Sequence, residues 1–411
     1  MTCGDRRVLG WGRRGRASIA WLLAWPMLGA AGLIGCGPST QPVEAYPTDY
    51  AALSRAVDRM VERTAAHAET IAGFGSRQTG QAGCRRTYEY VRSVLAGLDG
   101  GAGTLREFGS TVTVALDRDP ADGIEGESTS LTVEGLGEEA ERWPAHALAP
   151  NCIQPCRTRA EDETPRRLVD LGDGDPATWG DVDLAGAVVL LDFNSSQAWL
   201  RAIELGAYAA IFIEPEATTV QQADMKYLEI LPLYAPRVWI DRARGRQLRD
   251  ALSAGKDPRV TVRTRLGWRN VMAPCVEMTI PGKDRSRTFM LISHFDARSV
   301  VPDLSFGGDE VWGVAALLAM AEYYVEHPPA CDIRVTAVSG HWQSQRCTRD
   351  YMAAPGAGFD EIGQQLRLVV GLDYSTENVS LNLMREAAWG SDTLLPRSEE
   401  HTSELQSPNT I

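Results

Sequence analysis

Basic residues are fewer than acidic residues in this chain. It has 41 lysines and arginines against 54 aspartates and glutamates, which leaves a formal net charge of -13. Phosphate groups are bound by basic surfaces and repelled by acidic ones, so this balance argues against nucleic acid or an anionic membrane surface as a partner. We therefore expect small molecules or peptides as partners.

A second pair of closely spaced cysteines is also lacking. Cys152 and Cys156 form one close pair in the segment NCIQPC, but no second close pair of ligands accompanies it, which argues against a zinc knuckle. In an exported chain, we expect a local disulfide between Cys152 and Cys156. The pairing of the remaining cysteines stays open.

The first 36 residues have the layout of a bacterial export signal. An arginine-rich start precedes an uncharged apolar run that ends in LIGC at Cys36. A large residue, a small residue and a cysteine resemble the lipobox of lipoproteins, in which Cys36 would carry the lipid. A plain transmembrane anchor is the alternative, since the run is about as long as a bilayer requires. Both interpretations predict an exported protein tethered to the bacterial cell envelope.

The length and composition of the chain predict two folded units. It has 411 residues, of which 44% are hydrophobic and 23% charged. Apolar spacing predicts helices over Tyr50–Ala72 and Cys84–Leu98, and alternation predicts a strand over Glu107–Leu116. From there to about Pro165 the sequence is rich in turn residues and is predicted to be mostly loop.

The segment from about Leu168 to Arg265 alternates apolar strands with helices. LAGAVVLLDF and YAAIFIEP are strand-like, and AWLRAIELGA between them is a helix closed by Gly206, so the three predict a βαβ unit. This order resembles the protease-associated domain, a small α/β module often inserted in exported peptidases. A generic α/β segment is the alternative.

From Arg269 onward, strands again alternate with helical stretches, which predicts an α/β fold with a mixed, mostly parallel sheet flanked by helices. Polar residues follow the ends of its strands or open the next helix. They are His294 and Asp296 in SHFDARS, Asp309 after FGG, His341 in SGHWQ and Asp373 in GLDYS. Ligands of such sheets sit beyond the carboxyl ends of the strands, and imidazole with carboxylate suits zinc. A capping or turn role is the alternative for each residue taken alone.

Several segments resemble the catalytic domain of the M28 metallopeptidases of the aminopeptidase Y or leucyl aminopeptidase type. They are NVMAPCVEMTIPGKDRSRTFMLISHFDA, GGDEVWGVAALLAMA, RVTAVSG and VVGLDYS, with GFGSRQTGQAGCRRTYEYVRSVL similar to the family's N-terminal helix and loop. Beyond the export signal in 1–36, the resemblance implies the peptidase domain in 47–130 and 266–396, with an inserted protease-associated module in 131–265. Residues 397–411 resemble a translated sequencing adapter, so we expect them to be foreign to the fold.

The resemblance also implies site residues. In that family, two metal ions share a bridging carboxylate and activate a water for attack on a peptide carbonyl. His294 and Asp373 would bind one zinc ion, Asp309 would be the bridging carboxylate, and Asp296 would hydrogen-bond the other ring nitrogen of His294. The implied activity is the removal of N-terminal residues from peptides.

The chain departs from the family where two adjacent glutamates are expected. It has His341 and Trp342 there, and an indole has no lone pair for a metal. The last histidine ligand of the family would lie beyond the native sequence present. We therefore expect one complete metal site, made of His294, Asp309 and Asp373. His341 could serve as general base, bind a metal itself, or only pack beside Trp342.

The expected function is that of an exported, lipid-anchored, M28-like metal-dependent peptidase. One rival is an inactive relative that binds peptides as a scaffold. A second is another amide reaction on the same fold, such as glutaminyl cyclisation. A third is an adhesive surface module whose acidic residues only cap turns.

Overall fold

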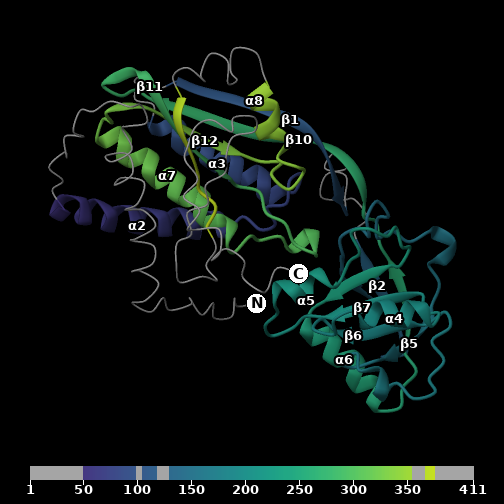
Figure 1. Ribbon diagram of the computed structural model, residues 1–411. Helices are drawn as coiled ribbons and strands as arrows, with labels where there is room; N and C mark the ends of the chain where they lie inside the picture. The colour runs from purple at the N-terminus through teal and green to yellow at the C-terminus, as the bar shows by residue number, and fades with distance from the viewer. Residues whose placement is uncertain (1–49, 99–103, 118–128, 354–365, 375–411) are drawn as a thin grey trace, which may run out of the picture.

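The computed structural model describes residues 50–98, 104–117, 129–353 and 366–374 (Figure 1). The predicted export signal, the lipidation site at Cys36 and the segment 397–411 lie outside the described residues. Within the described ranges, none of the helices combines the length and the apolarity that crossing a bilayer would take.

The first sheet has five strands in the described residues, in the order β1-β10-β12-β11-β13. β1 and β10 pair antiparallel along all of β1, whereas β11 lies parallel to both β12 and β13. The strands are β1 (Thr104–Leu116), β10 (Gly267–Ile280), β11 (Asp284–His294), β12 (Cys331–Val338) and β13 (Leu366–Gly371).

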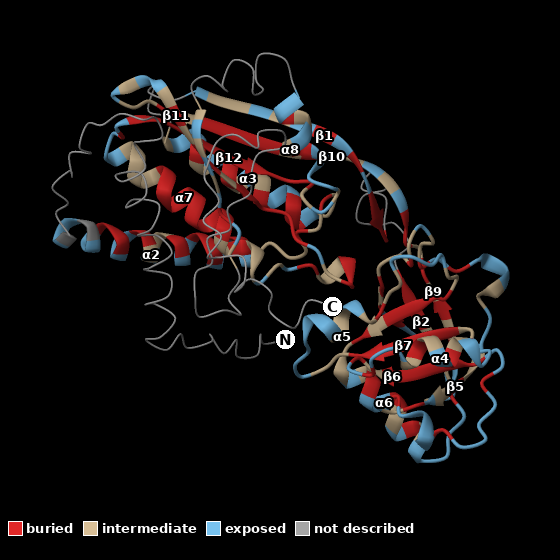
Figure 2. Ribbon diagram, in the orientation of Figure 1, coloured by how far each residue is buried: buried red, intermediate tan, exposed pale blue. Residues whose placement is uncertain are grey.

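Helices α3 and α7 pack on this sheet, α2 packs on α7, and α8 contacts β1 (Figure 1). α7 is buried on nearly all sides from Val311 to Ala321, because it lies between α2 and the sheet (Figure 2). The helices predicted over Tyr50–Ala72 and Cys84–Leu98 are confirmed, and the second begins two residues earlier than predicted. The helices of this part are α2 (Tyr50–Ala72), α3 (Ala82–Leu98), α7 (Glu310–Glu326) and α8 (Arg346–Ala353), with a 3-10 turn, η4 (Pro302–Leu304).

The second sheet is built from residues 130–263 and has eight strands there, in the order β3-β2-β9-β5-β6-β7-β8-β4. Its strands are β2 (Ser130–Glu134), β3 (Glu141–Pro144), β4 (His146–Ala147), β5 (Arg166–Asp170), β6 (Val188–Asp192), β7 (Ala209–Ile213), β8 (Arg237–Ile240) and β9 (Arg259–Arg263). Helices α4 (Ala198–Glu204), α5 (Val220–Asp224) and α6 (Arg242–Ser253) accompany it, with 3-10 turns η2 (Ala160–Asp162) and η3 (Pro176–Thr178).

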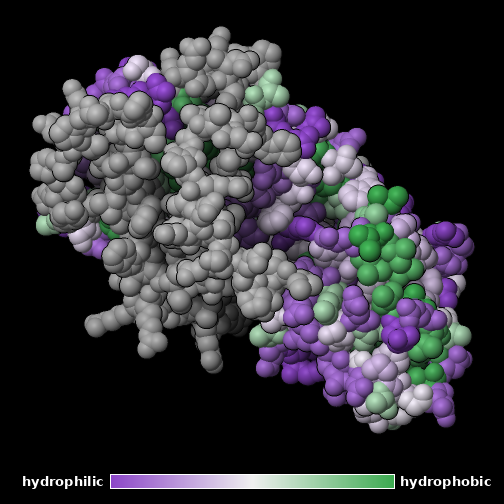
Figure 3. Space-filling view, viewed as in Figure 1, coloured by the Kyte–Doolittle hydropathy of each residue, from purple (hydrophilic) through white to green (hydrophobic). Residues whose placement is uncertain are grey.

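The sequence-based predictions for this second part are confirmed in one place and wrong in another. β6, α4 and β7 form the expected βαβ unit with parallel strands. The stretch predicted as loop, however, contains β2, β3 and β4, which are short and interrupted by turns. Both sheets mix parallel and antiparallel pairs and carry helices, which confirms the α/β class. In the space-filling view, the surface of this part is mostly hydrophilic, with hydrophobic patches between (Figure 3).

The predicted disulfide between Cys152 and Cys156 is contradicted by the structure, in which both thiols are free. The buried Cys156 Sγ donates to Arg237 O at 3.1 Å and accepts from Arg237 N at 2.9 Å. Its thiol is therefore committed to the backbone of β8, and Cys152 stands separately on the loop.

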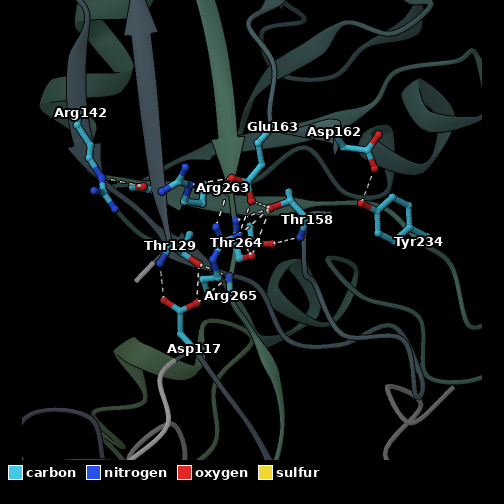
Figure 4. A network of polar contacts seen from close by, with 11 residues as sticks. Asp117, Thr129, Arg142, Thr158, Asp162, Glu163, Tyr234, Arg263, Thr264 and Arg265 are labelled. Carbon is cyan, nitrogen blue, oxygen red and sulfur yellow. Dashed lines mark hydrogen bonds and ion pairs between the residues drawn. The ribbon is translucent and has the colours of Figure 1, made fainter. Parts of the chain in front are cut away.

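A polar network lies where the chain enters and leaves the second sheet (Figure 4). The buried Asp117, just after β1, accepts hydrogen bonds from Thr129 N at 2.7 Å and from Arg265 N at 3.3 Å. Glu163 is paired with Arg265 and, at 2.9 Å, with Arg263. Burial raises the pKa of Asp117. Burial would also raise the pKa of Glu163, but hydrogen bonds from Arg265 and Thr158 outweigh it and lower that pKa.

Replacing Glu163 tests whether this network stabilises the fold. Because its pKa is depressed, the ionised carboxylate stabilises the folded chain above the unfolded pKa of about 4.3, and this contribution is lost as the pH falls. We expect Glu163→Gln to lower the free energy of unfolding by about 1–2 kcal/mol near neutral pH. The difference from the parent should shrink as the pH falls below about 4. Denaturant titrations at several pH values measure both.

The matched control is Glu204→Gln, which removes an exposed ion pair with Arg201. It should change the free energy of unfolding by less than about 0.5 kcal/mol at any pH. Equal losses in the two variants would show that the network contributes no more than a surface pair.

Candidate metal centre

Three parallel strands bring the predicted site residues to one edge of the first sheet. His294 is the last residue of β11 and lies beside Val338 of β12. Ile292 of the same strand pairs with Gly371 of β13, and its carbonyl accepts from Leu372 N at 2.8 Å. The carboxyl ends of parallel strands meet at the same edge of a sheet. His294, His341 and Asp373 therefore emerge side by side.

Gly313 of α7 allows the helix to approach these strand ends closely. A Cβ atom built there would lie 2.3 Å from Leu372 O and 2.7 Å from Ser293 Oγ, so no larger residue fits without movement. Ser293 Oγ itself donates to Leu372 O at 2.9 Å. The position of Asp373 is thus fixed by β11 on one side and by α7 on the other.

His294, His341 and Asp373 form a group whose possible ligand atoms all lie within 4.8 Å of one another. His294 Nε2 is 3.7 Å from Asp373 Oδ1, and the two imidazole rings stack with centroids 4.0 Å apart. His294 is 5% exposed, His341 is half-buried, and 71% of the Asp373 side chain is exposed. Two imidazoles and one carboxylate with an open side fit a zinc ion.

Asp296 orients both histidines. Its backbone carbonyl lies 3.0 Å from His294 Nδ1, and its Oδ1 lies 3.6 Å from the same nitrogen. With the proton on Nδ1, the lone pair of Nε2 is directed toward Asp373. Asp296 Oδ2 also accepts from His341 N at 3.1 Å. The sequence predicted the contact with His294, but the nearer acceptor is the carbonyl rather than the carboxylate.

The loop between α2 and α3 holds Asp296 and the backbone around it in place. Thr79 Oγ1 donates to Asp296 Oδ2 at 2.8 Å. Arg77 is fully buried and donates to Phe295 O at 3.1 Å and to Gly307 O at 2.6 Å. Sequence reasoning missed both roles, because an arginine and a threonine in a glycine-rich loop carry no signal of their own.

The three groups shift one another's ionisation. Burial lowers the pKa of His294, but its contacts with Asp296 and Asp373 outweigh burial and raise that pKa to about 10. The close contact with His294 lowers the pKa of Asp373. Burial and the charge of His294 both lower the pKa of His341. The site therefore attracts positive charge, which a proton or a cation can supply.

Asp309 lies at the N-terminal cap of α7 and is half-buried. Among the residues that the structure describes, the group of mutually close ligand atoms includes His341 and does not include Asp309. The expectation that Asp309 bridges metal ions stays a prediction. For the alternative that His341 itself binds a metal, the structure gives a defined arrangement of its ring with His294 and Asp373.

Trp342 covers one side of the group. Its ring meets the ring of His294 at 5.9 Å and that of His341 at 5.1 Å, edge to face in both cases. The side chain is 40% exposed and lines an open cleft of about 510 Å³. The tryptophan thus stands between the candidate centre and the cleft.

Removing the side chain of His341 tests whether this residue is a metal ligand or a general base. Loss of a residue that only hydrogen-bonds a metal ligand weakens metal binding roughly 10- to 100-fold. If His341 is itself a ligand, His341→Ala should weaken zinc binding by more than that. Competition with a fluorescent zinc chelator at constant pH measures the affinity. The control is His327→Ala, which removes an exposed histidine that stacks on Tyr323 far along α7. Unchanged affinity in His341→Ala would leave His341 only the role of a base or a packing residue.

Comparisons with known proteins find similar solved structures. No family model and no curated protein matches the chain. The zinc aminopeptidase BSAP from Bacillus subtilis is 14% identical, with 76% of this chain and 69% of that chain covered and a TM-score of 0.47. The aminopeptidase from Aneurinibacillus sp. strain AM-1 is 16% identical, with 77% and 72% covered and a TM-score of 0.36. A peptidase M28 precursor from Shewanella amazonensis SB2B is 14% identical, with 78% and 66% covered and a TM-score of 0.42.

Proposed function

We propose that this chain is an M28-type, zinc-dependent hydrolase that removes residues from the N-termini of peptides. The observation that carries the proposal is the convergence of His294, His341 and Asp373 at the carboxyl edge of the first sheet. The segments around these residues are the ones that resemble the family in sequence. A set of turn-capping residues would have no reason to gather within ligand distance of one another.

The residues of the site have different roles in this proposal. The zinc ion would be held by His294 Nε2, a ring nitrogen of His341 and a carboxylate oxygen of Asp373. A bound zinc ion supplies Lewis acidity toward a carbonyl oxygen and toward a water molecule. Asp296 fixes the tautomer and the ring plane of His294 and holds the backbone of His341. Trp342 restricts the entry of water from the side of the cleft.

The location of the protein is a separate proposal that rests on sequence alone. We propose export and lipid anchoring at Cys36, with the second sheet belonging to an inserted module of the protease-associated type. The peptide-binding rival without turnover remains the second candidate. The observation in its favour is Trp342, which occupies a position where the family has a metal-ligating acid.

Hydrolysis of a chromogenic aminoacyl anilide tests the proposed activity. With zinc added, the protein should release the chromophore, and Asp373→Asn should lower the rate at least about 100-fold, because metal assistance contributes several kcal/mol. Chelation should abolish release, and added zinc should restore it.

The matched control is Asp257→Asn, an exposed carboxylate on the second unit, which should retain the parent rate. Release that persists in both variants would rule out the proposed centre as its source. No release from zinc-loaded parent protein would favour the peptide-binding rival.

A further inference from the structure

The cleft beside Trp342 is bounded by strands of the first sheet and by loops of the second unit. One wall comes from β1 and β10, with Ala115 and Trp268 paired across the ladder. The opposite wall comes from the loop after α5, which contributes Tyr227 and Glu229. Arg298, four residues after His294, closes it from the side of the candidate centre. The cleft therefore lies next to that centre, with the ring of Trp342 between them.

The wall formed by β1 suits an extended chain. β1 is the edge strand of the first sheet among the described residues, and positions 113–115 face the cleft. An edge strand presents backbone N–H and C=O groups to which an extended peptide can add as a further strand. One such acceptor, Ala115 O, is bound by the side-chain amide of Gln78 at 2.8 Å, which a peptide N–H would replace.

The side chains of the cleft favour apolar, uncharged residues. Trp268 and Trp342 are 41% and 40% exposed, so each offers indole surface to an occupant. Arg298 and Glu229, the charged residues that line the cleft, are paired with each other at 3.6 Å. Arg298 also donates to the Tyr227 hydroxyl at 2.5 Å. The lining thus shows no unbalanced charge to select an acidic or basic partner.

We propose that this cleft holds the part of an extended peptide substrate that lies beyond the residue at the metal centre. The main chain of the peptide pairs with the edge of β1, and its apolar side chains pack against Trp268 and Trp342. The inference rests on the proposed function, because it takes the metal centre as the site of cleavage. It identifies the substrate class as oligopeptides with apolar residues after the first, rather than dipeptides.

Peptide binding to metal-free protein tests the cleft without turnover. The probes are a hexapeptide with leucine first, phenylalanine at its third and fourth places and glycine elsewhere, and the dipeptide of its first two residues. By calorimetry, the hexapeptide should bind roughly tenfold more tightly than the dipeptide. Trp268→Ala should remove that advantage, and Trp268→Phe should keep most of it. The control Ile230→Ala, an exposed apolar residue outside the lining, should change neither affinity.

Hydrogen exchange supplies a second measurement that needs no variant. Bound hexapeptide should slow exchange of the amides in 113–115, and the dipeptide should not. Equal affinity for the two peptides, an advantage that survives in Trp268→Ala, or unchanged exchange in 113–115 would each overturn the cleft proposal. Failure of zinc-dependent hydrolysis with this binding pattern intact would instead count against the proposed function alone.

Discussion

The buried carboxylate of Asp296 is the constraint on which the candidate centre depends. It is fully buried, and removing a charge from water is costly unless hydrogen bonds compensate. Its Oδ2 binds Thr79 and the backbone of His341, while Oδ1 has no hydrogen-bond partner and lies 3.6 Å from His294 Nδ1. One side chain therefore holds three segments of the chain together. The ring of His294 has a single favourable orientation as a result.

The pairing of β1 with β10 holds larger parts of the chain together, because it joins the two units. These two strands lead to and from the second sheet, and the network around Asp117 and Glu163 fixes the crossing point (Figure 4). Since Ala115 and Trp268 lie near that end of the ladder, the cleft forms where the second unit meets the edge of the first sheet. The same strands that join the two units thus provide a surface next to the candidate metal ligands.

Much of this arrangement could be predicted from local sequence. Apolar runs predicted the strands that end near His294, His341 and Asp373, and 3.6-residue spacing predicted α2 and α3. β2 to β4 were missed because short strands among turn residues give little alternation. Thr79 and Arg77 act through contacts with residues more than 200 positions away, which no local pattern reveals. The choice between Asp309 and His341 as the third member likewise depends on how α7 and the turn after β12 pack.

The most direct test of the central claim is a crystal structure of the protein grown with zinc, with data collected across the zinc absorption edge. The account predicts an anomalous peak at about 2.0–2.2 Å from a nitrogen of His294, a nitrogen of His341 and an oxygen of Asp373. An ion bound elsewhere, or one held by His294 with the ring of His341 turned away from it, would contradict the account.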